Sequence, residues 1–400
     1  MLTMTEQAVP EISDKRHPVR VLLVDDQRMV GEAVRRMVAD EGWLEYSYCQ
    51  KPEEAIAMAE VFQPTVILQD LVMPGIDGLS LVEQYKQHEQ LKHVPAIVLS
   101  SQEDPVVKAE SFTRGANDYL VKLPDRIELL ARIKHHSEGY IHLLERNAAF
   151  EALAENQRIL AGELAEAADY VRSLLPAPTQ GSVNIRWDFE SCSSVGGDSF
   201  GYRWLDDDNL IIYLLDVCGH GVGAALLSVS VMNALGNESL GNVDFKQPNA
   251  VLACLNDVFE MERHNNMYFT MWYGVYNRQS RELRYASAGH PPALLYRAGQ
   301  AEPECLVTPA LPVGTMPGLP FKEKTTEIAA DDRLYVYSDG VYEVQYQDGR
   351  EMTLEDFMPL LSKPLASGPD GLKQIRDTVA TIQQSDIFED DFSLVELTFQ

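Results

Sequence analysis

Between residues 19 and about 140, short apolar runs alternate with helical patterns, and this alternation limits the fold more than any other feature of the chain. The runs are almost continuously apolar. Strands of this kind need cover on both faces, which a parallel sheet between two layers of helices provides. We therefore expect a doubly wound α/β fold. The expected strands are VRVLLVDD, EYSYC, TVILQD, AIVLSS and DYLVK.

Polar side chains stand at the carboxyl ends of these strands. The first strand ends in Asp25 and Asp26, the third in Asp70, the fourth in Ser100 and the fifth in Lys122. Doubly wound sheets bind their ligands outside this edge. Three carboxylates there suit a hard cation such as Mg²⁺, beside which Asp70 could attack a phosphoryl group. Lys122 and Ser100 would hold the added phosphoryl oxygens.

Residues 19–137 resemble a response-regulator receiver domain, because LLVDD, LQDLVMPGIDGL, IVLSS and GANDYLVK occur in that family's order. The resemblance implies that Asp70 accepts phosphate from a histidine kinase or phosphotransfer protein. Ser100 and Tyr119 occupy the positions of the switch hydroxyl and the switch aromatic ring. The sequence KLP departs from the family, in which proline usually follows the lysine directly. The implied Mg²⁺ ligands are Asp25, Asp26, Asp70 and the backbone carbonyl of Val72.

A helical pattern without proline runs from Tyr140 to Leu175. With Leu143 at position a of a heptad, eight of ten successive a and d positions are apolar, and Arg146 and Gln157 are the exceptions. A seam of this length favours a coiled coil and a homodimer. The alternative is a single connecting helix that packs on either domain. The sequence PAPTQG then ends the helix.

From about Asn184 onward, strands follow one another and helical stretches are fewer. This order predicts a sandwich of largely antiparallel sheets flanked by helices. The expected strands include LIIYLLD, YFTMWYGVY, ELRYASAG, ALLYRA, RLYVYSD and FSLVELTF. The expected helices lie near 222–236, 248–262 and 370–384.

Aspartates stand at strand ends or turns in this half too. Asp216 ends an apolar run in LLDVCGHGVGAALL, and a carboxylate there is costly unless something positive holds it. The glycines after it let a ligand approach the backbone. A pair of divalent ions needs one bridging carboxylate and further acids on each side, and oxygen ligands favour Mg²⁺ or Mn²⁺. The other candidates are Asp198 in VGGDSFGY, Asp339 in YVYSDGVYE, and Asp390 with Asp391 in EDDFSLVEL.

Residues from about 170 to 400 resemble the metal-dependent (PPM-type) protein phosphatases, in the branch of the stage II sporulation E and sigma-regulation enzymes. The motifs YVRSLLP, VGGDSF, DVCGHGVGAA, YFTMWYGVY, ASAGHPPALLY, YVYSDGVYE and DDFSLV occur in order. The resemblance implies a serine/threonine phosphatase with two Mn²⁺ or Mg²⁺ ions. It also implies a phosphorylated protein client, for which it suggests an anti-sigma-factor antagonist. The implied ligands are Asp216 as the bridge, the carbonyl of Val217, Asp339, Asp390, and Asp198 on a metal or one contact behind it.

Other residues near these motifs have two possible roles. His220 and His290 could donate a proton to the leaving hydroxyl, or could hydrogen-bond their own turns. Glu343 could support a metal ligand or be solvated. Cys218 has no base near it in sequence, so we expect a small buried apolar side chain and not a nucleophile.

One departure leaves alternatives open. The family usually has a second aspartate three residues after the first, where this chain has Gly201. Its loss could weaken the binding of one metal ion. An alternative function therefore stays open, in which the domain is a phosphatase-like adaptor that binds a partner without catalysis. The sequence GGDSF also resembles the loop of diguanylate cyclases, but that loop needs an acid where Ser199 stands.

Composition bounds the remaining possibilities. The 400-residue chain has a net charge of −28, which argues against nucleic acid as a partner. No apolar run reaches about 18 residues, so no membrane span is expected. Five widely spaced cysteines indicate a reduced, cytoplasmic chain. The expected parts are a flexible leader over 1–18, a receiver domain over 19–139, a coiled-coil linker over 140–178 and a phosphatase domain over 179–400.

Overall fold

Two compact units make up the chain, and they part between Asn156 and Gln157, inside a single helix. Each unit has its own sheets and its own apolar core. The computed structural model describes residues 17–101, 103–192, 195–362 and 370–400.

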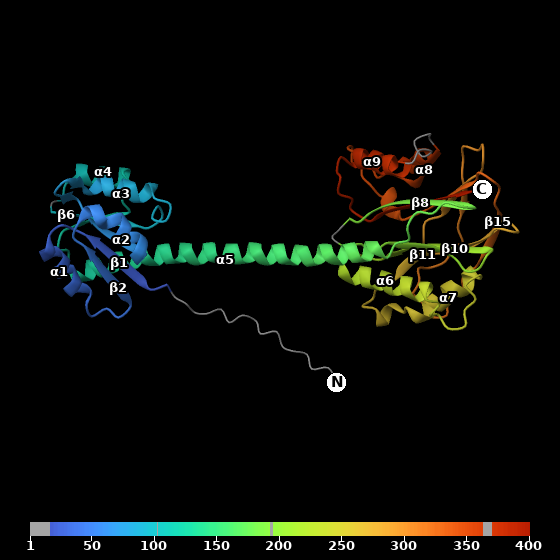
Figure 1. Ribbon diagram of the computed structural model, residues 1–400, viewed down its shortest axis with the longest axis horizontal. Helices are drawn as coiled ribbons and strands as arrows, with labels where there is room; N and C mark the ends of the chain where they lie inside the picture. The colour runs from blue at the N-terminus through green and yellow to red at the C-terminus, as the bar shows by residue number, and fades with distance from the viewer. Residues whose placement is uncertain (1–16, 102, 193–194, 363–369) are drawn as a thin grey trace. The chain divides into compact units, whose positions relative to one another are not determined.

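The N-terminal unit contains a parallel five-stranded sheet in the order β2-β1-β3-β6-β7 (Figure 1). This confirms the doubly wound fold. Strands β1 and β3 are neighbours, and Val24 lies opposite Gln69. The next residues, Asp25 and Asp70, are therefore adjacent at the carboxyl edge of the sheet. The strands are β1 (Val19–Val24), β2 (Leu44–Cys49), β3 (Val66–Asp70), β6 (Ala96–Ser100) and β7 (Asp118–Val121), with a small hairpin of β4 (Val72–Met73) and β5 (Ile76–Asp77). The helices are α1 (Arg28–Val38), α2 (Ala55–Phe62), α3 (Gly78–Gln87), α4 (Pro105–Thr113) and the start of α5 (Arg126–Ser173).

Apolar side chains cover both faces of this sheet. On one face, Val34 of α1 packs with Leu129 and Ile133 of α5. On the other, Ala59 of α2 packs with Leu81 of α3. A fully buried leucine or isoleucine contributes about 1.5–3 kcal/mol, so the start of α5 is an integral part of the core of the N-terminal unit.

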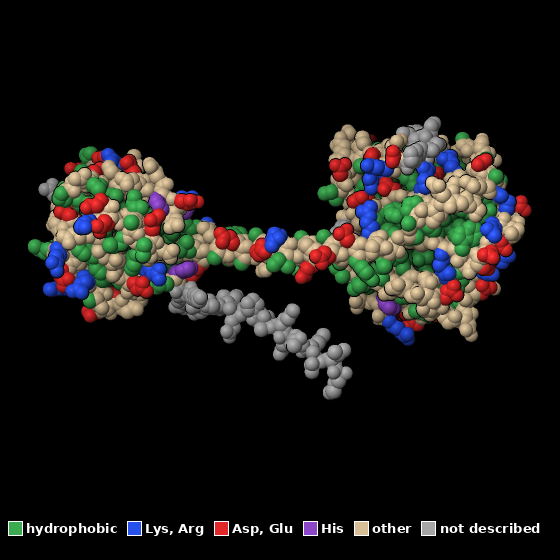
Figure 2. Space-filling model, in the orientation of Figure 1, with side chains coloured by type: hydrophobic (Ala, Val, Ile, Leu, Met, Phe, Trp, Pro, Cys, Tyr) green, Lys and Arg blue, Asp and Glu red, His purple; other side chains and the backbone are tan. Residues whose placement is uncertain are grey.

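Helix α5 is unbroken over its 48 residues. The predicted helix is confirmed, but its start moves back from Tyr140 to Arg126 because the helical spacing of Leu129 and Ile133 continues into the receiver core. Farther along, Phe150, Leu153 and Leu160 are 63%, 53% and 58% exposed. Figure 2 shows apolar side chains beside acidic ones along this stretch. The predicted domain limits stay predictions.

The C-terminal unit is a sandwich of two five-stranded sheets, as predicted. Their orders are β15-β12-β11-β10-β9 and β14-β13-β16-β17-β8, and the named pairings are antiparallel. The strands are β8 (Val183–Glu190), β9 (Ser199–Trp204), β10 (Asn209–Val217), β11 (Phe269–Asn277), β12 (Glu282–Ala288), β13 (Ala293–Tyr296), β14 (Glu304–Leu306), β15 (Lys324–Glu327), β16 (Arg333–Tyr337) and β17 (Phe392–Phe399). The helices are α6 (Val222–Gly236), α7 (Pro248–Val258), α8 (Leu354–Ser362) and α9 (Gly371–Gln383).

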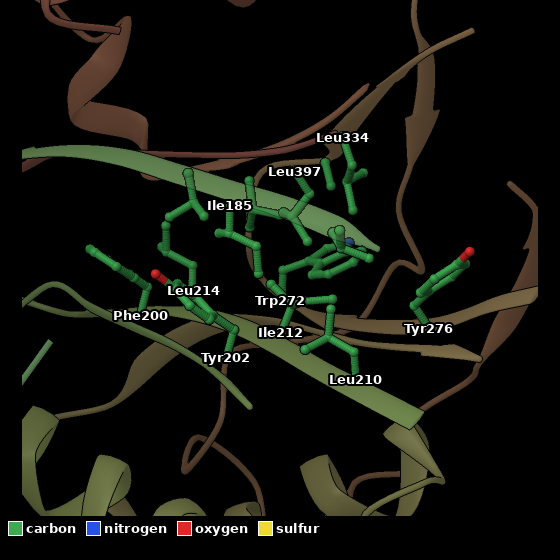
Figure 3. Close-up of a cluster of buried hydrophobic side chains, with 14 of the residues drawn as sticks. Ile185, Phe200, Tyr202, Leu210, Ile212, Leu214, Trp272, Tyr276, Leu334 and Leu397 are labelled. Carbon is green, nitrogen blue, oxygen red and sulfur yellow. The ribbon is translucent and has the colours of Figure 1, made fainter. Parts of the chain in front are cut away.

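Three apolar layers hold this sandwich together. Between the sheets, Leu214 and Trp272 of the first meet Leu397 of the second (Figure 3). Helices α6 and α7 cover the outer face of the first sheet, and α8 and α9 cover that of the second. Two rigid sheets therefore meet face to face, and loops at their ends can carry residues from both.

The register brings the predicted acids to one end of the sandwich. Asp198 stands just before β9, and Leu215 of β10 pairs with Ser199, so Asp216 ends beside it. Asp339 follows the end of β16 and Asp390 precedes β17, which pairs with β16. Residues far apart in the chain thus arrive from two different sheets.

Membrane-spanning helices are not found in the described part of the chain, since none there is both long enough and apolar enough.

Candidate active sites

The first site lies at the carboxyl ends of β1, β3 and β7. Lys122 Nζ lies 2.7 Å from Oδ2 of Asp70 and 3.1 Å from Oδ2 of Asp25. Both carboxylates are almost fully buried. Burial raises the pKa of Asp25 and of Asp70, and the lysine opposes that rise. For Lys122, burial lowers the pKa, but the two carboxylates outweigh it and the net shift is upward. The lysine is therefore a fixed internal counter-ion.

A divalent cation suits this pocket. Carboxylate oxygens of Asp25, Asp26 and Asp70 lie within 4.8 Å of one another. Oδ1 of Asp26 is buried and has no hydrogen-bond partner among the described residues. Buried charged oxygens are costly without a positive partner, so Mg²⁺ fits the donor set. The three predicted acids are thus brought together, while their role as ligands stays a prediction.

The loop after Asp70 lies close against it. A Cβ on Gly78 would overlap the backbone oxygen of Asp70, so only glycine fits there. The N–H of Val72 donates to Oδ1 of Asp70 at 3.2 Å, which orients the carboxylate. Ser100 and Tyr119 end up buried, on the neighbouring strands β6 and β7.

The second site is the acid cluster at the end of the sandwich. Burial raises the pKa of Asp216 to about 7, and the charges of Asp339, Asp390 and Asp391 add to the rise. Burial and the charge of Asp216 hold the pKa of Asp198 well above its usual range. The charges of these acids therefore act on one another, while their role as a common metal site stays a prediction. These acids also lack an internal cation of the kind that Lys122 provides in the receiver, within the stretches the structure describes.

Neutral donors hold Asp198 in this cluster. The hydroxyl of Ser393 donates to its Oδ2 at 2.6 Å. Its backbone N–H donates to Oδ2 of Asp391 at 3.1 Å. Since Ser393 lies on β17 and Asp391 directly before it, these bonds tie the start of β9 to the second sheet.

Asp391 has a role that the sequence did not indicate. Its carboxylate accepts hydrogen bonds from the N–H of Asp198, the N–H of Cys192 and the hydroxyl of Ser191. Its backbone oxygen accepts from Ser338. Because this carboxylate accepts three hydrogen bonds from residues that precede β9, its role is to hold these residues in place. Asp390 is exposed and accepts only one hydrogen bond from the described residues, from the N–H of Asp391 to its Oδ1, so Oδ2 of Asp390 is the oxygen of the pair that is better placed to bind a metal.

The remaining acids line the mouth of the site. Burial raises the pKa of Asp339, and the nearby exposed Glu343 adds to it. Burial also raises the pKa of Asp390, which His220 partly offsets, so His220 lies near this acid. Among the described residues, the tightest group here is Cys192, Asp390 and Asp391, and neither Asp216 nor Asp339 belongs to it. Like-charged carboxylates without a cation between them are expected to stand apart.

Glycines open the backbone around Asp216. A Cβ on Gly197 would lie 3.0 Å from the carbonyl oxygen of Val217 and 3.3 Å from that of Gly219. Gly221 has a φ of +91° just before α6, and His220 beside it is exposed. The predicted carbonyl ligand of Val217 is thus placed next to Asp216 in a crowded turn.

Gly201 faces away from the acids. A Cβ there would overlap the ring of Tyr213, its partner across the β9–β10 pair. Tyr213 is buried and stacks on Tyr273 on the side of the sheet covered by helices. The space that a side chain at this position would need is filled by the tyrosine.

Two other candidates have clear positions. Cys218 is only partly buried, and its Sγ accepts a hydrogen bond from the N–H of Tyr268 at 3.2 Å, so the expectation of a buried apolar side chain is wrong. The reason is the turn after β10, which places the sulfur against the backbone of Tyr268 and leaves the residue partly exposed. His290 is 4% exposed, and burial lowers its pKa to about 3.

Comparisons with known proteins agree with this geometry. The family model "Response regulator receiver domain" matches residues 21–134, and "Stage II sporulation protein E (SpoIIE)" matches residues 206–400. The chain is 27% identical over 244 residues to the phosphoserine phosphatase RsbU of Bacillus subtilis, a match that covers 60% of this chain and 71% of RsbU. It is 28% identical over 160 residues to the phosphoserine phosphatase RsbP of the same organism, which covers 40% of each chain.

A solved structure shares the fold of the C-terminal unit. The SiaA-PP2C domain of Pseudomonas aeruginosa superposes with a TM-score of 0.53 at 22% identity, over 62% of this chain and 100% of that one. Together with the two family matches, this shows the architecture. The chain is a response regulator that joins a receiver domain to a metal-dependent protein phosphatase domain of the stage II sporulation protein E family.

Proposed function

We propose that phosphorylation of Asp70 controls the hydrolysis of phosphoserine or phosphothreonine on a protein client at the acid cluster around Asp216. The observation that carries the proposal is the raised pKa of Asp216, which reflects several largely buried carboxylates with no internal cation beside them in the described residues. Acids crowded in this way are typical of metal and catalytic sites. We place the protein in the cytoplasm.

The donor sets indicate which residues would hold the metals. In the receiver we assign Mg²⁺ to Asp25, Asp26, Asp70 and the carbonyl of Val72. In the phosphatase domain two Mn²⁺ or Mg²⁺ ions would supply a water of lowered pKa and neutralise phosphoryl charge. We assign these two ions to Asp216 as the bridge, the carbonyl of Val217, Asp339 and Asp390, with Asp198 on a metal or one contact behind it.

The chain's own groups then perform the remaining tasks. Asp391 and Ser393 fix Asp198, and the hydroxyl of Ser338 in turn holds the backbone of Asp391. His220 is exposed, lies near Asp390 and precedes α6, so it is the better placed of the two histidines to protonate a leaving hydroxyl. The N-terminus of α6 adds a weak positive potential for an anionic substrate.

The client and the upstream partner follow from the domains. A receiver takes its phosphoryl group from a histidine kinase or phosphotransfer protein, whose phosphate Asp70 would accept. RsbU and RsbP are phosphoserine phosphatases, and the family resemblance points to a phosphorylated anti-sigma-factor antagonist as the client of this chain.

We further propose that α5 pairs with a second copy to form a homodimer. Phe150, Leu153 and Leu160 fall on the a and d positions of the heptads and are exposed. A triple change of these residues to glutamate should give a monomer by analytical ultracentrifugation. Glu151 is exposed on the same stretch of α5 but lies off this seam, so Glu151→Lys serves as a control that should keep the dimer.

Release of phosphate from an aryl phosphate with Mn²⁺ tests the activity. Asp216→Asn should lower the rate by about 10³-fold or more, because one carboxylate serves both ions. Asp207→Asn, a change of an exposed aspartate in the same domain, should leave the rate unchanged. Equal rates for wild type and Asp216→Asn would end the proposal and favour a non-catalytic adaptor.

Control by the receiver is tested with beryllofluoride and Mg²⁺, which mimic phosphorylation. The treatment should change the rate of client dephosphorylation in the wild type and have no effect in Asp70→Ala. An Asp70→Ala protein that still responds would contradict control through this residue.

A further inference from the structure

His290 lies where the chain crosses from one sheet of the sandwich to the other. It follows Gly289, whose φ is +67°, and two prolines then lead from β12 into β13. β12 belongs to the sheet of Asp216, whereas β13 belongs to the sheet whose loops present Asp339 and Asp390. The position of Asp216 relative to Asp339 and Asp390 therefore depends on how this connection between the two sheets is fixed.

The imidazole of His290 is hydrogen-bonded to the sheet of Asp216 and lies near the other sheet. Its Nδ1 lies 2.8 Å from Oγ1 of Thr270. Thr270 stands on β11 directly opposite Asp216 of β10. On the other side, the backbone of Tyr337, at the end of β16, interacts with the ring and partly offsets the lowering of its pKa by burial. Nε2 is buried and has no hydrogen-bond partner among the described residues.

The chemistry of the ring fits a bridge better than a proton donor. With a pKa of about 3, His290 is neutral at any pH used for an assay. A neutral imidazole carries one N–H and one bare nitrogen, so it can join a hydroxyl group to a backbone carbonyl. It has no acidic proton to give to a leaving alkoxide near neutral pH.

We propose that His290 is a positioning residue that fastens Thr270, and through it Asp216, to the segment that crosses from this sheet to the sheet of Asp339. This rests on the metal-binding roles assigned above. Asp198 has its own ties to the second sheet through Ser393 and Asp391. The His290 ring supplies the corresponding tie on the side of the bridging acid.

Calorimetric titration of the metal-free full-length chain with Mn²⁺ tests this proposal without any assay of activity, and every protein compared, the wild-type reference included, carries Asp25→Asn and Asp26→Asn so that the receiver site takes up no Mn²⁺. His290→Ala and Thr270→Val should each weaken Mn²⁺ binding by about tenfold, as changes behind a metal ligand commonly do. The double variant should bind no more weakly than the weaker single variant, because both changes remove one link. His290→Gln, which retains a donor and an acceptor, should recover most of the affinity.

A matched control is His264→Ala. This partly buried histidine of the same domain packs on Phe259 and should leave Mn²⁺ affinity unchanged. At saturating Mn²⁺, His290→Ala should keep kcat within about threefold of wild type and keep its pH–rate profile. This separates a positioning role from a proton donor, whose loss would change the profile.

Three results would overturn the proposal. Wild-type Mn²⁺ affinity in both single variants, with only a lower melting temperature, would leave His290 an ordinary packing residue. A kcat lost at saturating metal together with an altered pH profile would make it a proton donor. If the wild type itself bound no Mn²⁺, the metal assignment would fall and this proposal with it, whereas the first two results leave that assignment standing.

Discussion

The receiver and the phosphatase domain both gather aspartates at the ends of strands, but they balance the charge differently. In the receiver, Lys122 contacts Asp70 and Asp25 directly. In the phosphatase domain, Asp198 is held by the neutral hydroxyl of Ser393 and by no ion pair that the described residues show.

This difference shows how each pocket neutralises its carboxylate charge in the absence of a metal. The receiver carries a permanent positive charge that neutralises part of the negative charge of its acids, so a bound metal has only the remaining charge to neutralise. The phosphatase acids have only protons to neutralise them, as the pKa of about 7 for Asp216 shows. Metal binding there must displace protons, which couples affinity and stability to pH.

The largest effect that would test the comparison is expected from Lys122→Met. Removing one partner of a buried ion pair leaves Asp25 and Asp70 without their cation and should lower the receiver's free energy of unfolding by about 3–5 kcal/mol without Mg²⁺. Hydrogen exchange of β1 and β3 amides in the full-length chain measures it. Mg²⁺ should stabilise this variant more than the wild type.

Lys92→Met is the matched control, since Lys92 is exposed. If both lysine variants lost equally little stability, the receiver acids would not depend on an internal cation and the contrast between the domains would disappear.

A smaller effect is expected from Ser393→Ala in the phosphatase domain. The change removes the 2.6 Å hydrogen bond to Asp198 and leaves a buried carboxylate oxygen with one donor fewer, which should cost about 1–3 kcal/mol. Chemical unfolding followed by tryptophan fluorescence measures the loss. Ser230→Ala, at an exposed position of α6, should change stability little. An unaffected Ser393→Ala protein would show that neutral donors do not hold this acid.

The smallest effect concerns pH. The pKa of Asp216 rises on folding from 3.8 to about 7, so the folded state binds more protons across that range. The resulting stability is greatest below the lower value and is lost as pH rises to 7 and beyond. Without metal, the melting temperature of the phosphatase domain should therefore fall between pH 6 and pH 8, by about 2–4 °C for each kcal/mol lost.

Asp216→Asn should flatten this trend, and saturating Mn²⁺ should abolish it because the ion replaces the protons. A metal-free wild type whose melting temperature rose over the same interval, relative to Asp216→Asn, would contradict the assigned proton.

Much of this structure could be predicted because the decisive signals are local. Each receiver strand is a short apolar run with its polar residue at the end, and the parallel order follows from the helices between the strands. The acids Asp216, Asp339 and Asp390 were found in the same way, since each stands at a strand end or a turn.

Other features depend on contacts that sequence spacing does not reveal. Strand β15, with the sequence KTTE, is polar and lies at a sheet edge, so it has no apolar pattern. Helix α8 contains Pro359, a residue that usually argues against a helix interior. The role of Asp391 rests on donors that come from far earlier in the chain, such as Ser191, which is 200 positions away.

The pairing of Gly201 with Tyr213 has a consequence for any attempt to place an acid at this position. A side chain at 201 would overlap the ring of Tyr213, so Gly201→Asp alone should leave the β9–β10 pair poorly packed. An acid at 201 therefore requires a smaller residue at 213, and the two positions have to be redesigned as one unit.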